Sequence, residues 1–410
     1  MDSAYEVVVI GAGAAGLFAA TRAAERGRRT LLLEKNRKPG VKILMSGGTR
    51  CNLTHATDAR GIVEAFGDQG SFLHSALAAL GPEGLVAMFE AEGVATKVEA
   101  TGKVFPVSNR ALDVLLAARR MLDRSGTELR LGEAVVDIRR DGDGYVLQTE
   151  HGPIHADKVI ITVGGQSYPG CGTRGDGYAW AKAFGHKIIP PRPALVPLTS
   201  PAAWVAELSG VTIPDVHVQI AENGKKPEAS RRGSFLFTHV GLSGPAPMDI
   251  SRVVTAKPQA GGWQAVCDFV PSMNEQQIAE HLQSAASLDG RRGVLNLAAE
   301  LVPRRLAESI MTRAKIPADR RAAELSRTER AAIIDGLKRS TIPINGTLGF
   351  KKAEVTAGGV SLDEIDSRTM QSKLAPNLYF AGEILDLDGP IGGYNFQAAF
   401  STGWLAGEKV

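Results

Sequence analysis

A strand, a glycine-rich turn and a helix follow one another at the start of the chain, and this succession constrains the fold more than any other feature. The β-branched run Tyr5-Glu-Val-Val-Val-Ile10 leads into Gly11-Ala-Gly13-Ala-Ala-Gly16, and residues 17–26 have helical composition. Residues 30–34, Thr-Leu-Leu-Leu-Glu, are typical of a second buried strand. The beginning of the chain therefore predicts a βαβ unit of a parallel sheet.

The glycines of this turn have the spacing that a bound dinucleotide requires. Gly11 permits the tight turn, Gly13 lets the backbone approach a pyrophosphate, and Gly16 lets the helix pack closely on the strand. Glu34 lies 18 positions after Gly16, where its carboxylate can accept hydrogen bonds from the adenosine ribose and would repel a 2′-phosphate. The pattern favours FAD or NAD over NADP, and the alternative is a glycine turn that only closes a βα unit.

A second match to the same pattern, Gly170-Cys-Gly172-Thr-Arg-Gly175, lacks this context. It follows Tyr168-Pro169 instead of running directly out of a strand. A glycine pattern carries weight only with a strand before it and a helix after it. We therefore expect no independent nucleotide site there.

A long loop after the second strand favours FAD over NAD, because an isoalloxazine ring needs contacts far from the pyrophosphate. Residues 40–52, Gly-Val-Lys-Ile-Leu-Met-Ser-Gly-Gly-Thr-Arg-Cys-Asn, combine small residues with the donors Lys42, Arg50 and Asn52. We expect this loop to reach the flavin, and a surface loop without a ligand is the alternative.

The C-terminal segment offers matching contacts from the other end of the chain. Residues 379–383 indicate a strand that runs into a turn, and a glycine-rich turn and a helix follow. Glu383 and Asp388 are candidates for contacts to the ribityl chain. The turn 392–395 would aim a helix N-terminus at the flavin, where it stabilises negative charge on the reduced ring. The alternative is that this strand, turn and helix have a purely structural role.

Length and composition set the domain count and the class of protein. A chain of 410 residues exceeds the roughly 250–300 residues at which a single core stops growing, so two or three domains are expected. Four prolines between residues 190 and 197 favour an extended connection, and we place a domain boundary there. With 44% hydrophobic and 22% charged residues, the composition is that of a globular protein.

Net charge, cysteine count and hydrophobic runs argue against several other classes. The formal charge of +3 is small for this length, so we expect a small-molecule substrate and no nucleic acid partner. Three widely spaced cysteines argue against a disulfide framework and a paired-cysteine zinc site, and we expect no metal. No apolar run approaches about 18 residues, so we expect a cytoplasmic protein without a membrane span. The sequence sets no oligomeric state.

Five segments carry a resemblance that spans nearly the whole chain. They are residues 9–16 with 33–35, 42–54, 164–169, 237–245 and 381–395. Their motifs, among them Val-Ile-Gly-Ala-Gly-Ala-Ala-Gly16 and Gly-Gly-Gln-Ser-Tyr-Pro169, resemble a family of bacterial FAD-dependent oxidoreductases. That family includes aminoacetone oxidase and a bile-acid-pathway flavoprotein.

The resemblance implies an α/β fold with a Rossmann-type FAD-binding domain that is discontinuous in the sequence. We expect the first part of this domain over residues 1–193 and the second part over residues 344–410. An inserted β-barrel-like subdomain would occupy residues 194–273, and a small helical subdomain would occupy residues 274–343.

The resemblance also implies where FAD is bound. By similarity to two-domain flavoproteins, the backbone of Val135 would meet adenine, and Thr162 to Gly165 would pass beside the pyrophosphate. The candidate FAD-binding residues are Gly11, Gly13, Ala14, Ala15, Gly16, Glu34, Lys35, Lys42, Ser46, Gly47, Gly48, Arg50, Cys51, Asn52, Val135, Thr162, Gly164, Gly165, Gly382, Glu383, Asp388, Gly392, Gly393, Tyr394 and Asn395.

The expected activity is that of an FAD-dependent oxidoreductase, in which hydride passes through the flavin to or from a small organic substrate. NADH or NADPH as a transient reductant is one version. An amine oxidase that uses oxygen is a second version, and a flavin-bearing regulatory protein that contacts RNA is a third.

No catalytic residue follows from the sequence. His239 has an ordinary pKa near neutrality and could donate a proton, but a lone histidine is more often structural. Tyr168 and Tyr394 are equally ambiguous. Cys51 has no second cysteine nearby for dithiol exchange, so we expect it to pack near the ring without a redox role.

Overall fold

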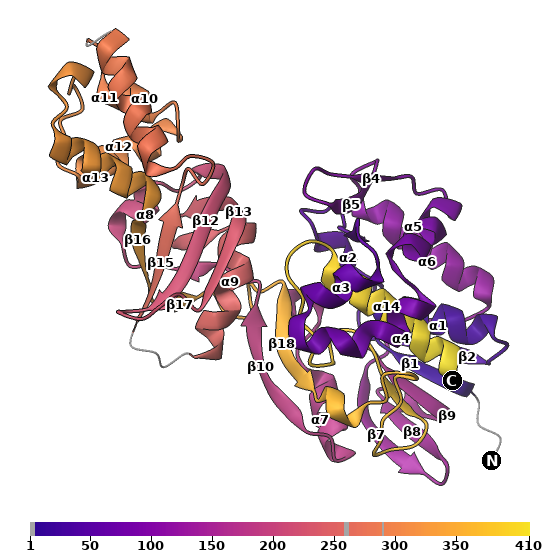
Figure 1. Cartoon of the computed structure of the whole chain (residues 1–410). Helices are drawn as coiled ribbons and strands as arrows, with labels where there is room; N and C mark the ends of the chain where they lie inside the picture. Colours follow the sequence, from indigo (N-terminus) through magenta and orange to yellow (C-terminus); the bar gives the residue numbers. More distant parts are fainter. Residues whose placement is uncertain (1–4, 258–261, 289–290) are drawn as a thin grey trace. The chain divides into compact units, whose positions relative to one another are not determined.

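The computed structural model describes residues 5–257, 262–288 and 291–410, apart from the side chains of residues 285–288. The chain divides into two compact units. The discontinuous unit is Met1–Pro193 with Glu354–Val410, and the inserted unit is Ala194–Ala353. Figure 1 shows the elements of both, coloured along the sequence from indigo to yellow. Each unit has its own main sheet and its own hydrophobic cluster.

A seven-stranded sheet organises the discontinuous unit. Its strands are β1 (Tyr5–Ile10), β2 (Thr30–Glu34), β6 (Glu128–Leu131), β7 (Val135–Asp141), β8 (Gly144–Thr149), β9 (Gly152–Ile161) and β19 (Leu378–Phe380). The spatial order is β6-β2-β1-β9-β8-β7, and β19 also pairs with β9. The pairs from β6 to β9 and the pair β9-β19 are parallel, whereas β7, β8 and β9 form an antiparallel meander. The parallel βαβ start is confirmed.

The parallel register brings segments from both ends of the chain to one edge of this sheet. Ile10 lies opposite Leu33 and Ile161, and Ile161 lies opposite Phe380. The residues that follow these four strands therefore meet at the same edge. This edge holds the glycine turn, Glu34 at the end of β2, Thr162 and the segment that begins at Ala381.

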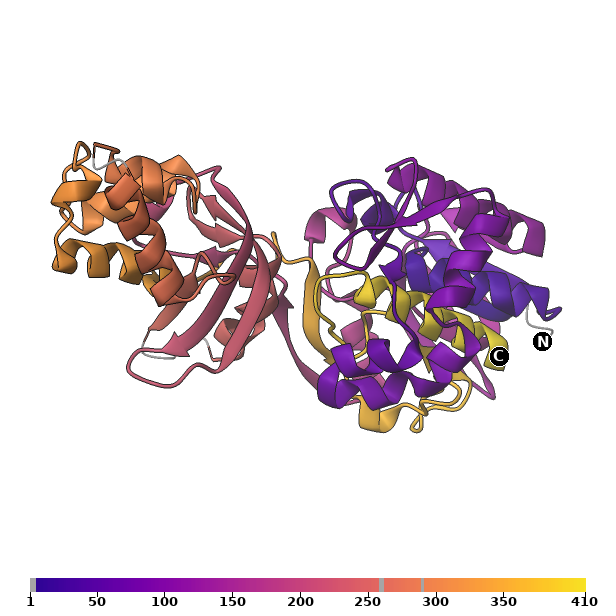
Figure 2. The same cartoon turned by 45° about the horizontal axis from the view of Figure 1, so that its top comes forward.

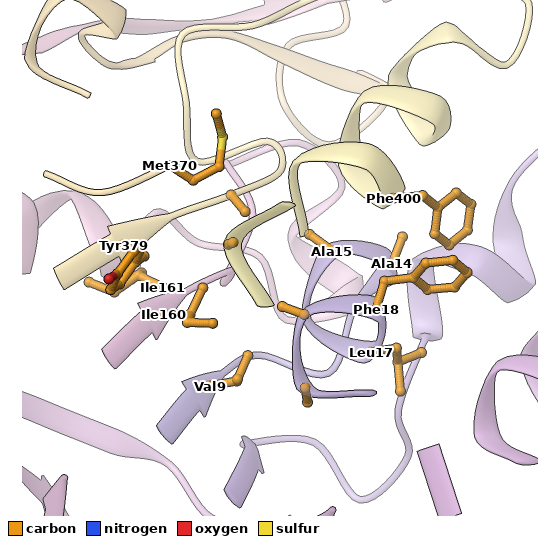
Figure 3. Close-up of a cluster of buried hydrophobic side chains, with 14 of the residues drawn as sticks. Val9, Ala14, Ala15, Leu17, Phe18, Ile160, Ile161, Met370, Tyr379 and Phe400 are labelled. Atoms are coloured by element: carbon orange, nitrogen blue, oxygen red, sulfur yellow. The ribbon is translucent and has the colours of Figure 1, made fainter. Parts of the chain in front are cut away.

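Helices α1 (Ala14–Glu25) and α14 (Tyr394–Lys409) pack against each other beside this sheet. In Figure 2 the yellow C-terminal helix lies next to the indigo start of the chain. Figure 3 shows the side chains between them, in which the rings of Phe18 and Phe400 have centroids 4.5 Å apart. The same cluster includes Val9 of β1, so strand and helices share one core.

Further helices and two small sheets complete the discontinuous unit. The helices are α2 (Val41–Met45), α3 (Ala59–Ala65), α4 (His74–Ala79), α5 (Pro82–Ala91), α6 (Ala111–Ser125) and α7 (Asp176–Ala183), with 3-10 helices at Gly67–Leu73, Pro169–Cys171 and Leu362–Glu364. The small sheets are β3 (Thr54–His55), β5 (Lys103–Pro106) and β4 (Thr96–Val98), and β10 (Ile188–Ala194) with β18 (Val355–Val360).

An antiparallel seven-stranded sheet organises the inserted unit. Its strands are β11 (Leu198–Thr199), β12 (Thr212–Glu222), β13 (Ala229–Thr238), β14 (Gly241–Ser243), β15 (Trp263–Asp268), β16 (Ser340–Ile344) and β17 (Gly346–Thr347). The order is β16-β15-β12-β13-β14-β11-β17. Only Asn345 separates β16 from β17, so the two strands at opposite ends of the order adjoin. The sheet therefore curls toward closure, as a barrel does.

The helices of the inserted unit share one hydrophobic cluster with its strands. They are α8 (Ala203–Glu207), α9 (Pro245–Ala256), α10 (Glu275–Leu288), α11 (Val294–Ala298), α12 (Arg304–Arg313) and α13 (Arg327–Lys338), with a 3-10 helix at Ala322–Glu324. Ile310 and Leu337 belong to the same cluster as Val218 and Phe237. The sequence predicts a separate helical subdomain over residues 274–343. In Figure 1 helices α10 to α13 are grouped together within the inserted unit, and their buried side chains belong to the same hydrophobic cluster as those of the strands.

The second part of the discontinuous unit begins at Glu354, ten residues after the boundary that the sequence predicts at residue 344. The reason is β17, in which Thr347 pairs with Leu198 and Gly346 pairs with Thr199. These backbone hydrogen bonds hold the segment on the sheet of the inserted unit.

Within the described residues, no single helix is both long and apolar enough to cross a membrane. One bent pair of helices, Gly67–Ala79 and Pro82–Ala91, passes the test of length and composition only when the two are taken together across a bend of 41°.

Candidate functional site

The glycine turn after β1 is built by backbone contacts that leave no room for side chains. Gly11 has φ +99°, and a Cβ on Gly16 would lie 1.8 Å from the carbonyl oxygen of Gly11. Thr162 fixes the turn from the neighbouring strand, because its hydroxyl lies 2.8 Å from the Ile10 oxygen and 2.9 Å from the Gly11 oxygen. Gly11 and Gly16 are therefore required by the packing of the protein itself.

Gly13 differs from these two glycines, because a Cβ on it would meet no protein atom within 4 Å. It stands directly before helix α1, whose N-terminus has no side-chain cap and no acidic residue in its first turn. Backbone N–H groups at such an end attract an anion. The open space at Gly13 and the uncapped helix over Ala14 and Ala15 thus fit a pyrophosphate.

Glu34 is buried at the end of β2 and holds the turn in place. One carboxylate oxygen accepts the N–H of Ala12 at 2.8 Å, and the other accepts the N–H of Asn36 at 2.9 Å. A carboxylate has about four acceptor positions, so each oxygen can accept one further bond from a ribose hydroxyl. Glu34 thus has a structural role besides the predicted one. The neighbouring Lys35 is paired with Asp176 at the start of α7.

A network of polar side chains joins three distant segments beside the C-terminal end of the sheet. The ammonium group of Lys42 is paired with Glu383 and lies 2.6 Å from the Ser167 hydroxyl. Glu383 accepts the Ser167 hydroxyl at 2.5 Å and the N–H of Thr356 at 2.9 Å. The sequence predicts Lys42 and Glu383 as separate candidates, and the structure brings them into direct contact.

Ser167 and Thr356 are members of this network that the sequence does not single out. The Thr356 hydroxyl accepts the N–H groups of Gln166 and Ser167 at 2.8 and 2.9 Å. A Cβ on residue 165 would lie 2.4 Å from this hydroxyl oxygen, so a glycine is needed there for the close approach. The motif Gly-Gly-Gln-Ser over residues 164–167 was the sequence signal for Ser167. No local pattern marks Thr356 of β18 as its partner.

The loop after α2 has unusual backbone conformations. Gly47, Gly48, Thr49 and Cys51 all have φ between 54° and 68°. For the non-glycine residues this conformation is strained, and such strain concentrates at functional sites. Ser46, at the start of the loop, donates its hydroxyl to the Ile43 oxygen at 2.9 Å.

Arg50 is directed away from the role that the sequence predicts for it as a flavin donor. Its guanidinium is paired with Glu99 at 2.6 Å and lies over the Phe105 ring, 3.9 Å from the centroid. These partners belong to the small sheet β3-β5-β4 and the turn of its hairpin. A contact between this side chain and a flavin would require both interactions to be given up.

Cys51 is fully buried, and burial raises the pKa of its thiol from 9.0 to about 12. The thiol is therefore protonated at neutral pH and is a poor nucleophile. Cys171 and Cys267 are also buried and free, and no disulfide joins any of the three. These findings agree with a flavin that works without a thiol partner.

The turn before α14 is tied to strand β3. Gly393 has φ +95°, and a Cβ there would lie 2.4 Å from the Thr54 carbonyl oxygen. The side chain of Asn52 accepts the Gly393 N–H at 2.9 Å and donates to the Thr54 oxygen at 3.0 Å. The hydroxyl of Thr54 is buried and has no hydrogen-bond partner in the described part of the chain. It is a polar group that a bound cofactor can satisfy at this turn.

His55 is a site residue that the sequence does not indicate. Its Nδ1 lies 3.1 Å from the Gly392 oxygen, and since a carbonyl only accepts, Nδ1 carries the proton. The imidazole stacks on Tyr394, with centroids 4.7 Å apart and an angle of 19°. Asn395 stabilises the preceding loop, where its amide bonds to both the N–H and the oxygen of Gly389.

The remaining candidates lie at the same edge of the sheet or are structural. Val135 begins β7, and the segment before it approaches the end of β2, where Glu133 N–H donates to the Glu34 oxygen at 2.9 Å. Gly382 allows close packing, since a Cβ on it would be 2.8 Å from that of Ala15. A Cβ on Gly164 would lie 3.0 Å from the Thr173 side chain. Asp388 is buried, and its backbone N–H donates to the side-chain oxygen of Gln69.

The structure gives the positions of the two other candidates for proton donation, His239 and Tyr168, but no role for them. His239 is exposed in the turn that follows β13 of the inserted unit. Tyr168 is partly buried in the left-handed conformation, with φ 56°. Nothing in their surroundings assigns either residue a catalytic role.

The glycine turn, the acid at the end of β2 and the C-terminal turn thus converge on one edge of a parallel sheet. This is the arrangement of a Rossmann-type FAD-binding domain, and the protein is an FAD-dependent oxidoreductase. The chain belongs to the family described as HI0933-like protein Rossmann domain, whose model matches residues 5–409. The predicted fold class and family are confirmed.

Several relatives are similar to nearly the whole chain. The ribosomal RNA dihydrouridine synthase of Escherichia coli (strain K12) is 34% identical over 99% of this chain and 98% of its own length. The 3-dehydro-bile acid delta(4,6)-reductase of Clostridium scindens is 32% identical over 98% of both. Among solved structures, a variant of the E. coli quinol fumarate reductase FrdA has a TM-score of 0.50 and 16% identity over 98% of this chain and 69% of that one, which supports the fold alone.

Proposed function

We propose that the protein is a reductase that saturates a ring carbon–carbon double bond conjugated to a carbonyl group, with uridine of ribosomal RNA as its substrate. The observation that carries the proposal is the full-length similarity to proteins named ribosomal RNA dihydrouridine synthase, at 34% identity for that of Escherichia coli and 32% for that of Haemophilus influenzae. The third relative, a bile acid reductase at 32% identity, supports the broader reaction class.

The names of these relatives share one reaction chemistry. Dihydrouridine is uridine whose base has gained two hydrogen atoms across C5=C6, a double bond conjugated to the C4 carbonyl. A delta(4,6)-reductase of a 3-dehydro steroid removes ring double bonds of the same conjugated kind. A bound FAD, once reduced by two electrons from an external donor, supplies the hydride, and a proton completes the saturation. NADH or NADPH is the proposed donor.

The residues of the site fit the binding of this cofactor. The open turn at Gly13 and helix α1 would hold the pyrophosphate, and Glu34 would hold the ribose of the adenosine. Lys42, Glu383 and Ser167 would contact the ribityl chain. The N-terminus of α14, which has no acidic residue in its first turn, would face negative charge on the reduced ring.

The proposed RNA substrate differs from the expected small molecule without a nucleic acid partner, an expectation that was based on the small net charge of the whole chain. That charge is distributed unevenly. The inserted unit has 20 Lys and Arg against 15 Asp and Glu, a formal charge of +5, and the discontinuous unit has 27 against 29, a formal charge of −2. A local excess of positive charge supports contacts with RNA phosphates.

An anaerobic assay tests the proposal. The purified FAD-bound protein is reduced with NADH or NADPH, and ribosomal RNA from a strain that lacks the gene is added. Reoxidation of the flavin together with a mass gain of two hydrogen atoms on a uridine supports the proposal.

Three other outcomes would redirect it. Reoxidation by a steroid dienone but not by RNA would assign the substrate class of the bile acid reductase. Flavin reduction by an amine followed by rapid reoxidation with oxygen would indicate an oxidase. Tight RNA binding without turnover would indicate a regulatory flavoprotein.

A further inference from the structure

A hollow opens on the sheet of the inserted unit, and none of its residues belongs to the cofactor site. The strands that form it, β12, β13 and β15, are neighbours in the sheet (Figure 1). The hollow has a volume of about 580 Å³, within the roughly 300–1,000 Å³ typical of small-molecule sites, so it has room for one nucleotide unit. Its lining residues are His217, Ser230, Arg231, Arg232, Asp268 and Pro271.

Three of these side chains stand in one row across the sheet. His217 of β12 lies opposite Arg232 of β13 on one side and opposite Asp268 of β15 on the other. Directly opposed residues of an antiparallel sheet project from the same face. That face is not the one in the core, because the neighbours of His217 along β12, Val216 and Val218, are fully buried. The register thus places a guanidinium, an imidazole and a carboxylate side by side on the outer face.

Two guanidinium groups at the hollow are held in position by carboxylates. Arg232 donates to Asp215 through Nε and one terminal nitrogen, at 2.8 and 2.7 Å. The Nε of Arg231 lies 2.9 Å from a carboxylate oxygen of Asp249. A guanidinium has five N–H groups, so both keep donors for a further acceptor. The side chains of Arg232 and Arg231 are 54% and 46% exposed, so a ligand in solution can reach these donors.

The carboxylate in the row leaves no uncompensated negative charge in the hollow. Asp268 accepts the N–H of Val270 at 3.0 Å and pairs with Lys338 of α13 at 2.6 Å. By contrast, the imidazole of His217 and the hydroxyl of Ser230 have no hydrogen-bond or ion-pair partner in the described part of the chain. The hollow therefore combines compensated charges with two polar groups that still lack a partner.

We propose that this hollow binds a phosphate of the RNA backbone. Phosphate oxygens only accept hydrogen bonds, and two guanidiniums, an imidazole and a hydroxyl all offer donors to them. Contacts of this kind fix the register of a nucleic acid on a protein and carry no sequence information. The hollow therefore positions the RNA and does not select the uridine.

The inference rests on the proposed function and adds a place where the substrate is held. The inserted unit has a formal charge of +5, but the three ion pairs leave the hollow itself nearly balanced. The charge of the whole unit attracts a polyanion over a distance, whereas the hollow holds one phosphate by oriented donors. The two contributions can be separated by experiment.

The test uses the full-length FAD-bound protein and a fluorescent oligouridylate, with binding measured by anisotropy. His217→Glu places a negative charge in the hollow at a side chain that has no partner to lose. Binding should weaken about tenfold, because the carboxylate repels the phosphate and removes a donor. His239→Glu is the matched control, since His239 is an exposed histidine in the turn after β13 of the same unit. It makes the same change in total charge and should alter the dissociation constant less than about twofold.

A second variant keeps the test valid if His217→Glu does not fold. Ser230 is exposed, so Ser230→Asp adds a negative charge to the hollow at little cost in stability. Weaker binding with an unchanged unfolding temperature supports the phosphate site. With ribosomal RNA as the substrate, both hollow variants should raise KM and leave kcat unchanged, because the hollow holds the backbone and takes no part in the transfer of hydride.

The possible failures are distinguishable. If His217→Glu and Ser230→Asp bind oligouridylate like the wild type, or no more weakly than His239→Glu, the hollow is overturned, and reduction of uridine by these variants leaves the proposed function standing. If the hollow variants lose RNA binding but the wild type reduces only a steroid dienone, the proposed function fails and the phosphate site stands. If the wild type binds no RNA even at low salt, both are overturned.

Discussion

The two units of the chain differ in how often backbones meet at glycines. In the discontinuous unit such contacts occur at many positions, among them Gly11, Gly16 and Gly403, where a Cβ on Gly403 would lie 2.2 Å from the Ala15 oxygen. In the inserted unit they are fewer, as at Gly241, and the core has large side chains such as Phe235 and Phe237, whose rings are 4.8 Å apart. The comparison teaches that the unit with the cofactor site depends more on close backbone approach, and the inserted unit more on side-chain volume.

The two units also differ in formal charge. The formal charge is −2 for the discontinuous unit and +5 for the inserted unit, although the sum of +3 looks unremarkable. A dinucleotide site needs few cations, because helix N-termini and backbone N–H groups hold the phosphates. The excess of cations on the inserted unit fits the contact with RNA phosphates that we propose.

The largest expected effect separates glycines that the fold needs from the glycine that the ligand needs. Gly16→Ala should prevent the discontinuous unit from folding, because its Cβ would lie 1.8 Å from a backbone oxygen. A Cβ on Gly13 would meet no protein atom within 4 Å, so ligand-free Gly13→Val should have an unfolding free energy within about 1 kcal/mol of the wild type but retain no FAD. Denaturant unfolding and flavin content measure the two effects. Retention of FAD by Gly13→Val would refute the pyrophosphate site.

Cavities made in the two cores should have separate consequences. Phe237→Ala and Phe400→Ala each remove a fully buried ring, and each should cost about 3–5 kcal/mol. Because the clusters are distinct, only Phe400→Ala should reduce FAD content, since Phe400 packs on Phe18 of the helix that follows the glycine turn. Equal loss of FAD in both variants would show that the units do not fold separately.

High pH should destabilise both units through their buried thiols. Burial raises the pKa of Cys51 to about 12 and also raises that of Cys267, whereas an unfolded thiol ionises near 9. The folded protein therefore binds more protons than the unfolded chain above pH 9, and stability falls by up to about 1.4 kcal/mol per pH unit for each thiol. Unfolding free energies of Cys51→Ala and Cys267→Ala between pH 8 and 11 should show shallower slopes. An unchanged slope would contradict the burial of that thiol.

The smallest expected effect concerns the surface charge of the inserted unit. Lys351 and Lys352 are exposed, and reversing both to Glu should weaken RNA binding about tenfold and make it less dependent on salt. The matched reversal of Lys182 and Lys187, exposed residues of the discontinuous unit, should change binding much less. Binding measured over a salt series checks the difference. An equal loss in both double variants would show that the uneven charge does not determine where RNA binds.

Several features of the site follow from local sequence, because their signals lie within a few residues. The βαβ start, the roles of Gly11 and Gly16 and the position of Glu34 are readable from spacing, since each depends on one strand, one turn and one helix. The turn before α14 is likewise readable from its two adjacent glycines, Gly392 and Gly393. The two bonds of Glu34 to the backbone N–H groups of Ala12 and Asn36 were not readable from the sequence.

Other features depend on contacts that no local pattern records. Ser167 and Thr356 meet Glu383 only because β9 and β19 pair in register, and His55 meets Gly392 across most of the chain. The sequence predicts Arg50 as a hydrogen-bond donor to the flavin. In the structure its guanidinium instead pairs with Glu99 and lies over the Phe105 ring. The helices of residues 274–343 have the composition of a subdomain, but the burial of their apolar faces joins them to the strands.

The sequence by itself determined the cofactor class, the parallel start of the fold and the glycines of the turn, because these are properties of neighbouring residues and of backbone geometry. The tertiary structure decided which groups meet: the pairing of Lys42 with Glu383, the hydrogen bond between the Asn52 side chain and the Gly393 N–H, and the stacking of His55 on Tyr394. Such contacts depend on strand register and on close packing between remote segments, and both are set only when the whole chain has folded.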